Sequence, residues 1–228
     1  QSEDDDSQPS GSNAGSRGRP KLIRSGKVGR SKKVYNTLHF ADGNDDVPIP
    51  QSFRDAISGE QSGKWKNAMN IEYSALKQNK TWSLVDLPNG KKAIGSKWVF
   101  NLKNDEMGNI ERFKARLVAK GCSQEFGVNY SETFSPVVRY STIRMMFALA
   151  AEKELYLHHV DVSTAYLNSQ LNEEVYMRQP DGFVDENNPK QVLRLKKAIY
   201  GLKQSGRAWN TTLDRAIRNI GFKPCESE

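Results

Sequence analysis

The chain has 228 residues, and its 34 Lys and Arg exceed its 27 Asp and Glu to give a formal net charge of +7. This length is enough for one or two domains, and the positive charge favours polyanionic partners. No apolar run approaches the roughly 18 residues that cross a bilayer, so no membrane partner is expected. Two distant cysteines, Cys122 and Cys225, argue against a disulfide scaffold and a zinc knuckle.

Residues 1–50 have little to bury. Ser, Gly, Asp and Asn dominate the start of this stretch, and such a composition cannot offset the entropy of ordering the chain, so we expect a disordered tail. It contains a basic run with no acidic residue inside it, made of Arg17, Arg19, Lys21, Arg24, Lys27, Arg30, Lys32 and Lys33. Three interpretations stay open: a solvated linker, a nuclear localisation signal, or an AT-hook, whose core RGRP resembles.

A pattern of helices and strands begins near residue 51. Apolar residues at spacings of three and four predict an amphipathic helix over 64–79. A turn at Gly108–Asn109 lies between two strand-like runs, which predicts a hairpin. The strands expected in this half are 81–87, 96–103 and 111–119.

The second half continues the pattern. Ser141 is a suitable N-cap for a helix over 141–154, and an apolar strand is expected over 155–162. Shorter strands follow at 174–177 and 192–197, and a final helix carries Trp209 and Leu213 on its apolar face. Helices that pack on short, partly antiparallel strands predict an α+β fold.

Asp161 lies at the end of the strand expected over 155–162, just before a turn-like segment. A carboxylate in this position can bind Mg²⁺, which prefers oxygen ligands and leaves positions for water and phosphates. Because two-metal phosphoryl transfer needs a second carboxylate, Asp161 taken alone is more simply a turn or cap residue. The adjacent His158 and His159 point to opposite faces of a strand and cannot chelate one metal together, so they are interpreted as structural or exposed.

Two further segments carry positive charge. Arg112, Lys114 and Arg116 alternate along one strand and share a face, which can bind a triphosphate or a template backbone, or can simply be solvated. The segment 197–209 interleaves aromatic and basic residues, as sites for single-stranded or hybrid nucleic acid do. Its alternative is a strand-to-helix junction with core aromatics.

Taken in chain order, these segments resemble the reverse transcriptase region of copia-type LTR-retrotransposon polyproteins. The resemblance covers roughly residues 60–223 and rests on KWKNAMNIEYSAL, NKTWSLVDLPNGKKAIGSKWVFNLK, RFKARLVAKGCSQEFGVNYSETFSPVVRYSTIRMMFALAA, VDVSTAYLNSQLNEEVYMRQPDGF and LKKAIYGLKQSGRAWN. It implies a right-hand polymerase, with the fingers and the N-terminal palm in residues 51–228. The implied activity is RNA- and DNA-templated DNA synthesis by two-metal nucleotidyl transfer.

The resemblance also implies residue roles. Asp161 matches the first catalytic aspartate, a ligand of both Mg²⁺ ions, and the Val162 carbonyl matches a further ligand. Thr164 and Ala165 match the turn whose backbone amides meet the incoming triphosphate, and Tyr166 matches the aromatic steric gate beneath its sugar. The other matches are Lys114 and Arg116 in the fingers hairpin that grips the triphosphate, and Tyr200, Gly201 and Lys203 near the nucleotide and template.

Departures from the family pattern limit the implied activity. Gly206 stands where the family usually has Pro, and the second carboxylate motif, Tyr-x-Asp-Asp, does not occur in the sequence. We therefore expect a fragment, truncated before that motif and inactive alone, with residues 1–50 as the joint between integrase and reverse transcriptase. The alternative is a non-catalytic nucleic-acid-binding remnant of a degenerate element.

The expected partners follow from the same resemblance. They are an RNA template, a DNA primer, dNTPs and the rest of the Pol polyprotein, namely integrase, thumb and RNase H. The expected location is a cytoplasmic virus-like particle, the nucleus, or both.

Overall fold

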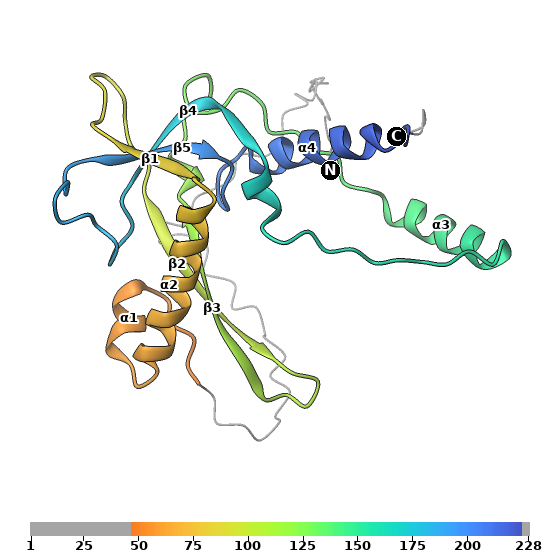
Figure 1. Cartoon of the computed structure of the whole chain (residues 1–228), viewed down its shortest axis with the longest axis horizontal. Coiled ribbons are helices and arrows are strands. Elements are labelled where there is room, and N and C mark those ends of the chain that lie inside the picture. Colours follow the sequence, from red (N-terminus) through yellow and green to blue (C-terminus); the bar gives the residue numbers. More distant parts are fainter. Residues whose placement is uncertain (1–46, 225–228) are drawn as a thin grey trace, which may run out of the picture. The chain divides into compact units, whose positions relative to one another are not determined.

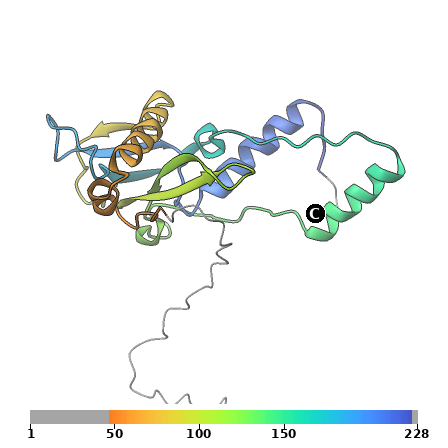
Figure 2. The same ribbon diagram turned by 90° about the horizontal axis from the view of Figure 1, so that it is seen from below.

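The computed structural model describes residues 47–224, all within one unit of the chain, residues 42–228. Helices and antiparallel strands make up this part (Figures 1 and 2), in agreement with the α+β prediction. None of the helices described is long and apolar enough to span a membrane. Apart from residues 47–50, the predicted disordered tail, its basic run and the integrase joint lie outside the described residues.

Two helices open the described part. α1 (Phe53–Ser58) begins after Ser52, whose hydroxyl accepts a 3.2 Å hydrogen bond from the Asp55 backbone N–H. This bond satisfies one of the N–H groups that the first turn of a helix leaves unpaired. α2 (Ser62–Gln78) matches the helix predicted over 64–79 except that Asn79 is its C-cap, and its buried face carries Trp65, Ala68, Met69 and Leu76. The three- and four-residue spacing therefore predicts this helix correctly.

The predicted hairpin is formed by β2 (Ser96–Asn104) and β3 (Ile110–Ala119), which pair antiparallel. At the turn, Asp105 Oδ1 accepts hydrogen bonds from the backbone N–H of Met107 at 2.9 Å and of Asn109 at 2.8 Å. Local bonds of this kind are the reason that Asp favours turns. The hydrogen bonds of Asp105 therefore hold the turn that sets the register of β2 against β3.

A second sheet contains β1 (Trp82–Val85), β4 (Gln170–Arg178) and β5 (Val192–Lys197) in the antiparallel order β1-β5-β4. An isolated bridge joins this sheet to the chain just before β2. There the Ile94 N–H donates to the Tyr176 carbonyl at 2.8 Å, and the Ile94 carbonyl accepts from the Arg178 N–H at 2.9 Å. The three strands confirm the predictions at 81–87, 174–177 and 192–197.

One apolar core connects α2, the hairpin and the three-stranded sheet. Trp65 of α2 meets the hairpin edge-on, with its ring centroid 5.2 Å from that of Phe100 and 4.7 Å from that of Phe113. Met177 and Leu193 bring β4 and β5 into the same core and are fully buried. Burial of each such side chain contributes about 1.5–3 kcal/mol. The core therefore fixes β3 against α2, where the site lies.

A backbone seam joins the end of the hairpin to the residues before α4 (Ser205–Asn219). The Ala119 N–H donates to the Tyr200 carbonyl at 2.8 Å. A Cβ on Gly201, whose φ is +91°, would collide with the Ala119 carbonyl, and a Cβ on Gly121 would collide with the Gly201 carbonyl. Only glycine permits such close approach of two backbones. We call residues 119–121 together with 200–201 the backbone seam.

Buried amides extend this connection. Gln124 Nε2 donates to Gln204 Oε1 at 3.0 Å, and Gln124 Oε1 accepts from the Lys203 backbone N–H at 2.8 Å. Gln204 Nε2 in turn donates to the Asn129 carbonyl at 2.9 Å. Buried polar groups must find partners, and these two glutamine side chains satisfy each other and two backbone groups across a separation of about 80 residues.

Two helices have apolar faces that are only partly covered by other described residues. On α3 (Tyr140–Glu152), Met145, Met146 and Phe147 are each more than half exposed. On α4 the apolar face is half-buried at Leu213, whereas Ile220 just beyond the helix is 73% exposed. The predicted helices at these places are confirmed, but their burial is incomplete.

Two details of the sequence prediction are wrong. Arg139, not Ser141, is the N-cap of α3, and no side chain caps the helix. Because Tyr140 is already helical, Ser141 lies inside the first turn, beyond the capping position. Residues 155–162 form no strand, and Leu155, Tyr156 and Val160 are exposed. A strand needs a hydrogen-bonded neighbour, and the described part of the chain offers none to this segment.

Candidate functional site

A cavity of about 470 Å³ brings together α2, β3, the segment 161–167 and Tyr200. These parts lie far apart in the sequence and meet beside the backbone seam. The polar and aromatic residues of its lining are Glu72, Arg112, Lys114, Arg116, Asp161, Ser163, Thr164, Tyr166 and Tyr200. Most of the predicted site residues therefore share one cavity.

The cationic wall of the cavity comes from β3. Arg112, Lys114 and Arg116 all line it, which confirms that their alternation places them on one face. Lys103 of β2 is paired directly with Arg112 in the register of the hairpin. Partial burial, followed by the charges of Arg116, Arg112 and Lys103, lowers the pKa of Lys114. Such crowding of cations is unfavourable by itself and favours an anionic ligand.

Glu72 is a cavity residue that the sequence analysis missed. It projects from α2, and its Oε1 accepts a 3.4 Å hydrogen bond from the Leu117 backbone N–H. Burial raises the pKa of the Glu72 carboxyl, and this bond and the charges of Arg116 and Lys114 oppose the rise. The available signal was its helical spacing, since a residue four before the buried Leu76 lies beside the buried stripe.

Asp161 and Val162 also line the cavity, from an exposed segment without regular secondary structure. Asp161 is an exposed carboxylate, and the predicted strand before it is absent. Among the residues that the structure describes, no three His, Cys, Asp or Glu side chains converge to hold a metal. His158 and His159 are exposed, one of the two alternatives predicted for them.

The turn after Asp161 leads into a short 3₁₀ helix, η2 (Ala165–Asn168). Thr164 precedes it in the left-handed region, with φ +52° and ψ +39°. This conformation is uncommon for a residue with a branched side chain and costs about 1–3 kcal/mol. The strained turn presents the start of η2, and with it the half-buried Tyr166, to the cavity.

Tyr166 and Tyr200 lie against each other. Their ring centroids are 4.8 Å apart at an interplanar angle of 62°, an edge-to-face contact. The Arg116 guanidinium lies over the Tyr200 ring, 4.8 Å from its centroid. The sequence placed these three residues in separate motifs, and the structure joins them into one stack within the cavity.

Gly201 and Lys203 are not part of this lining. Gly201 belongs to the backbone seam, where it fixes the position of Tyr200. Lys203 Nζ donates to the Tyr130 hydroxyl at 3.1 Å and lies 4.5 Å from the centroid of the same ring. Ala165 also lies outside the lining, although it directly follows Thr164. The cavity therefore brings together seven of the ten predicted site residues and leaves out these three.

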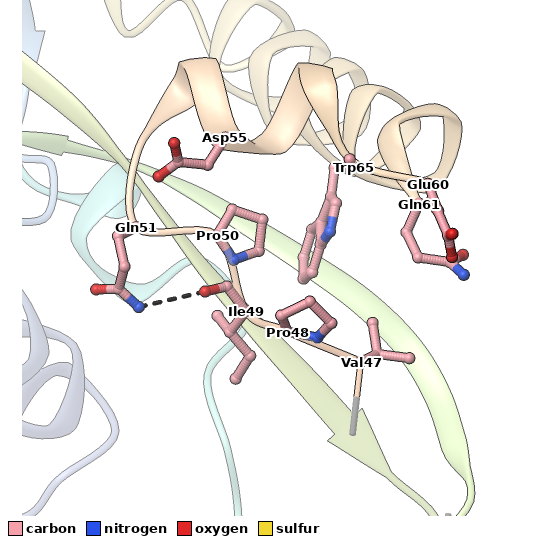
Figure 3. A pocket seen from close by; sticks show the side chains of 10 residues that line it. Val47, Pro48, Ile49, Pro50, Gln51, Asp55, Glu60, Gln61 and Trp65 are labelled. Atoms are coloured by element: carbon pink, nitrogen blue, oxygen red, sulfur yellow. Dashed lines mark hydrogen bonds between the residues drawn. The ribbon is translucent and has the colours of Figure 1, made fainter. Parts of the chain in front are cut away.

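A second cavity, of about 680 Å³, lies where residues 47–51 cross α1 and the start of α2 (Figure 3). Val47, Pro48 and Pro50 line it together with the Trp65 ring, and Gln51 Nε2 donates to the Ile49 carbonyl at 3.2 Å. Of the described residues that line it, two are carboxylates, Asp55 and Glu60, and none is basic. This cavity therefore lacks the charge arrangement of the first one.

Comparison with known proteins agrees with the resemblance seen in the sequence. A family model described as reverse transcriptase (RNA-dependent DNA polymerase) matches residues 79–228. The retrovirus-related Pol polyprotein from transposon RE2 of Arabidopsis thaliana is 44% identical over 170 residues, which cover 74% of this chain and 12% of that protein. The Pol polyprotein from transposon TNT 1-94 of Nicotiana tabacum is 38% identical over 198 residues, which cover 87% of this chain and 15% of that protein.

No solved structure matches the chain. The chain spans only 12–15% of the length of these relatives. The family match nevertheless covers well over half of the 228 residues. The chain therefore belongs to the reverse transcriptase (RNA-dependent DNA polymerase) family, in its copia-type transposon branch.

Proposed function

We propose that the chain supplies the fingers and the N-terminal palm of an RNA-directed DNA polymerase, and that the 470 Å³ cavity binds the incoming dNTP. The observation that carries this proposal is the meeting of three cations, one exposed carboxylate and an aromatic ring in a single cavity. A dNTP complements these groups: its triphosphate matches the cations, its phosphate oxygens can share a metal ion with the carboxylate, and its sugar can lie on the aromatic ring. Lys114 and Arg116 bind the triphosphate, and Tyr166 lies beneath the sugar.

The donor atoms fit Mg²⁺ in part. The Asp161 carboxylate and the Val162 carbonyl are hard oxygen ligands beside the cationic wall, and they would hold an ion together with phosphate oxygens and water. A bound ion of this kind stabilises the charge that develops during phosphoryl transfer. Thr164 and Ala165 orient the phosphates through their backbone amides, because the first turn of a short helix leaves N–H groups without acceptors.

Two observations support the view that this part of the enzyme is incomplete. Among the described residues, no three His, Cys, Asp or Glu side chains converge on one metal position, and Glu72, the other carboxylate of the cavity, accepts a hydrogen bond from the Leu117 N–H. The exposed apolar side chains of α3 and of residues 155–160 also form a surface that a folded protein normally covers. A further palm segment, with the second carboxylate motif, would cover this surface and complete the site.

The partners of the complete enzyme follow from this proposal. An RNA template and a DNA primer lie along the basic side of the cavity, where Tyr200, Gly201 and Lys203 come close to the nucleotide and the template. The rest of the Pol polyprotein, with integrase, thumb and RNase H, completes the molecule, and residues 1–50 join integrase to this part.

Primer extension tests the proposal. We expect the 228-residue chain alone to incorporate no dNTP on poly(rA)·oligo(dT) with Mg²⁺, because the loss of one charge-stabilising group costs several kcal/mol in the transition state. The complete polyprotein reverse transcriptase should extend the primer, and its Asp161→Asn variant should not. Incorporation by the purified chain that disappears in Asp161→Asn would contradict the proposed incompleteness.

The second candidate is a non-catalytic nucleic-acid-binding remnant, and it is favoured by the basic wall of a cavity in which the described residues form no group of three metal-binding side chains. The same assay separates the two. A remnant binds template and primer, yet remains inactive even when the complete polyprotein is tested.

A further inference from the structure

Tyr166 could only exclude a 2′-hydroxyl if its ring is held still. A side chain with two free torsions that faces an open cavity would move aside, and a moving ring discriminates poorly. The groups that restrain Tyr166 therefore decide how well it can act as a gate.

Within the described residues, the Tyr166 ring makes an aromatic contact with the ring of Tyr200. Tyr200 meets it at 4.8 Å and 62°, and neither tyrosine hydroxyl has a hydrogen-bond partner among those residues. The restraint on Tyr166 thus comes from ring packing rather than from a polar contact, and Phe could provide it at position 200 equally well.

Tyr200 itself is fixed from two directions. Its carbonyl accepts from the Ala119 N–H at the end of β3, and Gly201 locks the same backbone into the seam. The Arg116 guanidinium lies over its ring at 4.8 Å, a cation–π contact. Both restraints originate on β3, the strand that also carries the proposed triphosphate ligands.

We propose that Tyr200 is a positioning residue, which holds the Tyr166 ring in place and so sets the discrimination between deoxyribose and ribose. This inference rests on the proposed dNTP site but adds a residue that acts through Tyr166 rather than on the sugar. It also links the triphosphate wall to the gate, since Arg116 stacks on Tyr200 and Tyr200 packs on Tyr166.

The first experiment measures the rNTP/dNTP ratio of kcat/KM in the complete reverse transcriptase. Tyr166→Val, which removes the gate, should raise the ratio at least about tenfold. Tyr200→Ala should raise the ratio between about twofold and tenfold, the range expected for the loss of an edge-to-face ring pair. Tyr200→Phe, which keeps the ring, should have the same ratio as the wild type. In the double variant Tyr166→Val/Tyr200→Ala, the ratio should equal that of Tyr166→Val alone.

Tyr73 provides the matched control. Its ring stacks on Phe183 with centroids 4.4 Å apart, and it does not line the cavity. Tyr73→Ala should lower thermal stability and leave the ratio unchanged. A ratio that rises equally in Tyr73→Ala would show that loosening of the fold, rather than loss of the gate restraint, causes the effect.

The outcomes separate the inference from the proposed function. If Tyr166→Val leaves the ratio unchanged, the proposed sugar site is wrong. If Tyr166→Val opens the gate but Tyr200→Ala does not, only the positioning role is wrong. Additive effects in the double variant would instead mean that Tyr200 contacts the sugar directly, which also overturns the inference.

A second measurement needs no catalysis and uses the 228-residue chain. In NMR spectra with ¹³C-labelled tyrosine, the Tyr166 ring signals, identified by Tyr166→Phe, should shift in Tyr200→Leu and stay in place in Tyr73→Leu. Unchanged Tyr166 signals in Tyr200→Leu would show that the two rings do not pack in solution and would overturn the inference.

Discussion

Burial and nearby charges act in opposite directions on the pKa of the Glu72 carboxyl. It is one of two carboxylates in the cavity lined by Arg112, Lys114 and Arg116, yet burial raises its pKa more than the Leu117 N–H and the cations lower it. In the folded state the charged form is therefore less favourable than in the unfolded chain, where the pKa is near the ordinary 4.5.

This shift predicts a pH-dependent effect of Glu72→Gln. Below pH 4.5 the carboxyl is protonated in both states and costs no stability. As the pH rises through the raised pKa, the folded wild type loses stability that the Gln variant keeps. The melting temperature of Glu72→Gln minus that of the wild type should therefore increase between pH 4 and pH 8, measured by calorimetry.

Gln78→Ala on the same helix changes no titratable group, and its difference from the wild type should stay constant with pH. If the Glu72→Gln difference instead decreases as the pH rises, Lys114 and Arg116 stabilise the charged carboxylate more than burial opposes it.

The sequence predicted individual site residues better than their contacts. Alternation along β3 is a local property, so it identified the shared face of Arg112, Lys114 and Arg116 correctly. The contact of Tyr166 with Tyr200 depends instead on how η2 and the backbone seam meet, which no local spacing encodes. Helical spacing places Glu72 beside the buried stripe of α2, but its contact with the Leu117 N–H depends likewise on how α2 folds against the end of β3.

Among the elements, α3 is the helix whose apolar face is least explained by the described residues. Its apolar side chains Met145, Met146, Phe147 and Leu149 are exposed by 39–57%. The helix was predicted from this same apolar pattern. Periodicity indicates which side chains form the apolar face, but it does not indicate which segment packs against that face. The strand expected at 155–162 is absent for a similar reason. The segment is apolar, as a strand would be, but no described residues pair with it.

The exposed face of α3 predicts a contrast between the chain and the complete enzyme. Met145→Gln/Phe147→Gln should change the free energy of unfolding of the 228-residue chain by less than about 1 kcal/mol, as for exposed positions, and should reduce its self-association in sedimentation. In the complete enzyme the same change should cost about 2–5 kcal/mol, because a palm segment then buries both side chains.

Leu193→Ala serves as the reference, since Leu193 is 2% exposed in the core and should cost about 2–5 kcal/mol in both proteins. A comparable loss from the α3 double variant in the 228-residue chain would mean that α3 is already covered there.

At the scale of the whole molecule, positive charge is distributed over both the basic run and the folded part. We expect weak, salt-sensitive binding of the 228-residue chain to single-stranded nucleic acid, because its cations release counterions from the phosphates. Deletion of residues 17–33, which contain eight basic residues, should lower the affinity. The slope of log K against log salt should become shallower by about 0.7 for each lost phosphate contact.

A variant with residues 17–33 in scrambled order keeps the charge and should bind with the original slope. If scrambling weakens binding to A/T-rich duplex DNA alone, the RGRP element acts as an AT-hook. A slope that the deletion leaves unchanged would mean that the basic run contacts no phosphate.

The backbone seam has a consequence for how transposon copies decay. A neutral copy accumulates substitutions at random, and under the proposed function the loss of Asp161 would mark a copy that cannot polymerise. Any side chain at Gly121 or Gly201 would force apart two backbones that hold Tyr200 in place, although every chemical group of the cavity would still be encoded. If the proposed function is right, surveys of genomic copies should count these two glycines with the aspartate, because we expect a copy that retains Asp161 but has lost either glycine to lack polymerase activity.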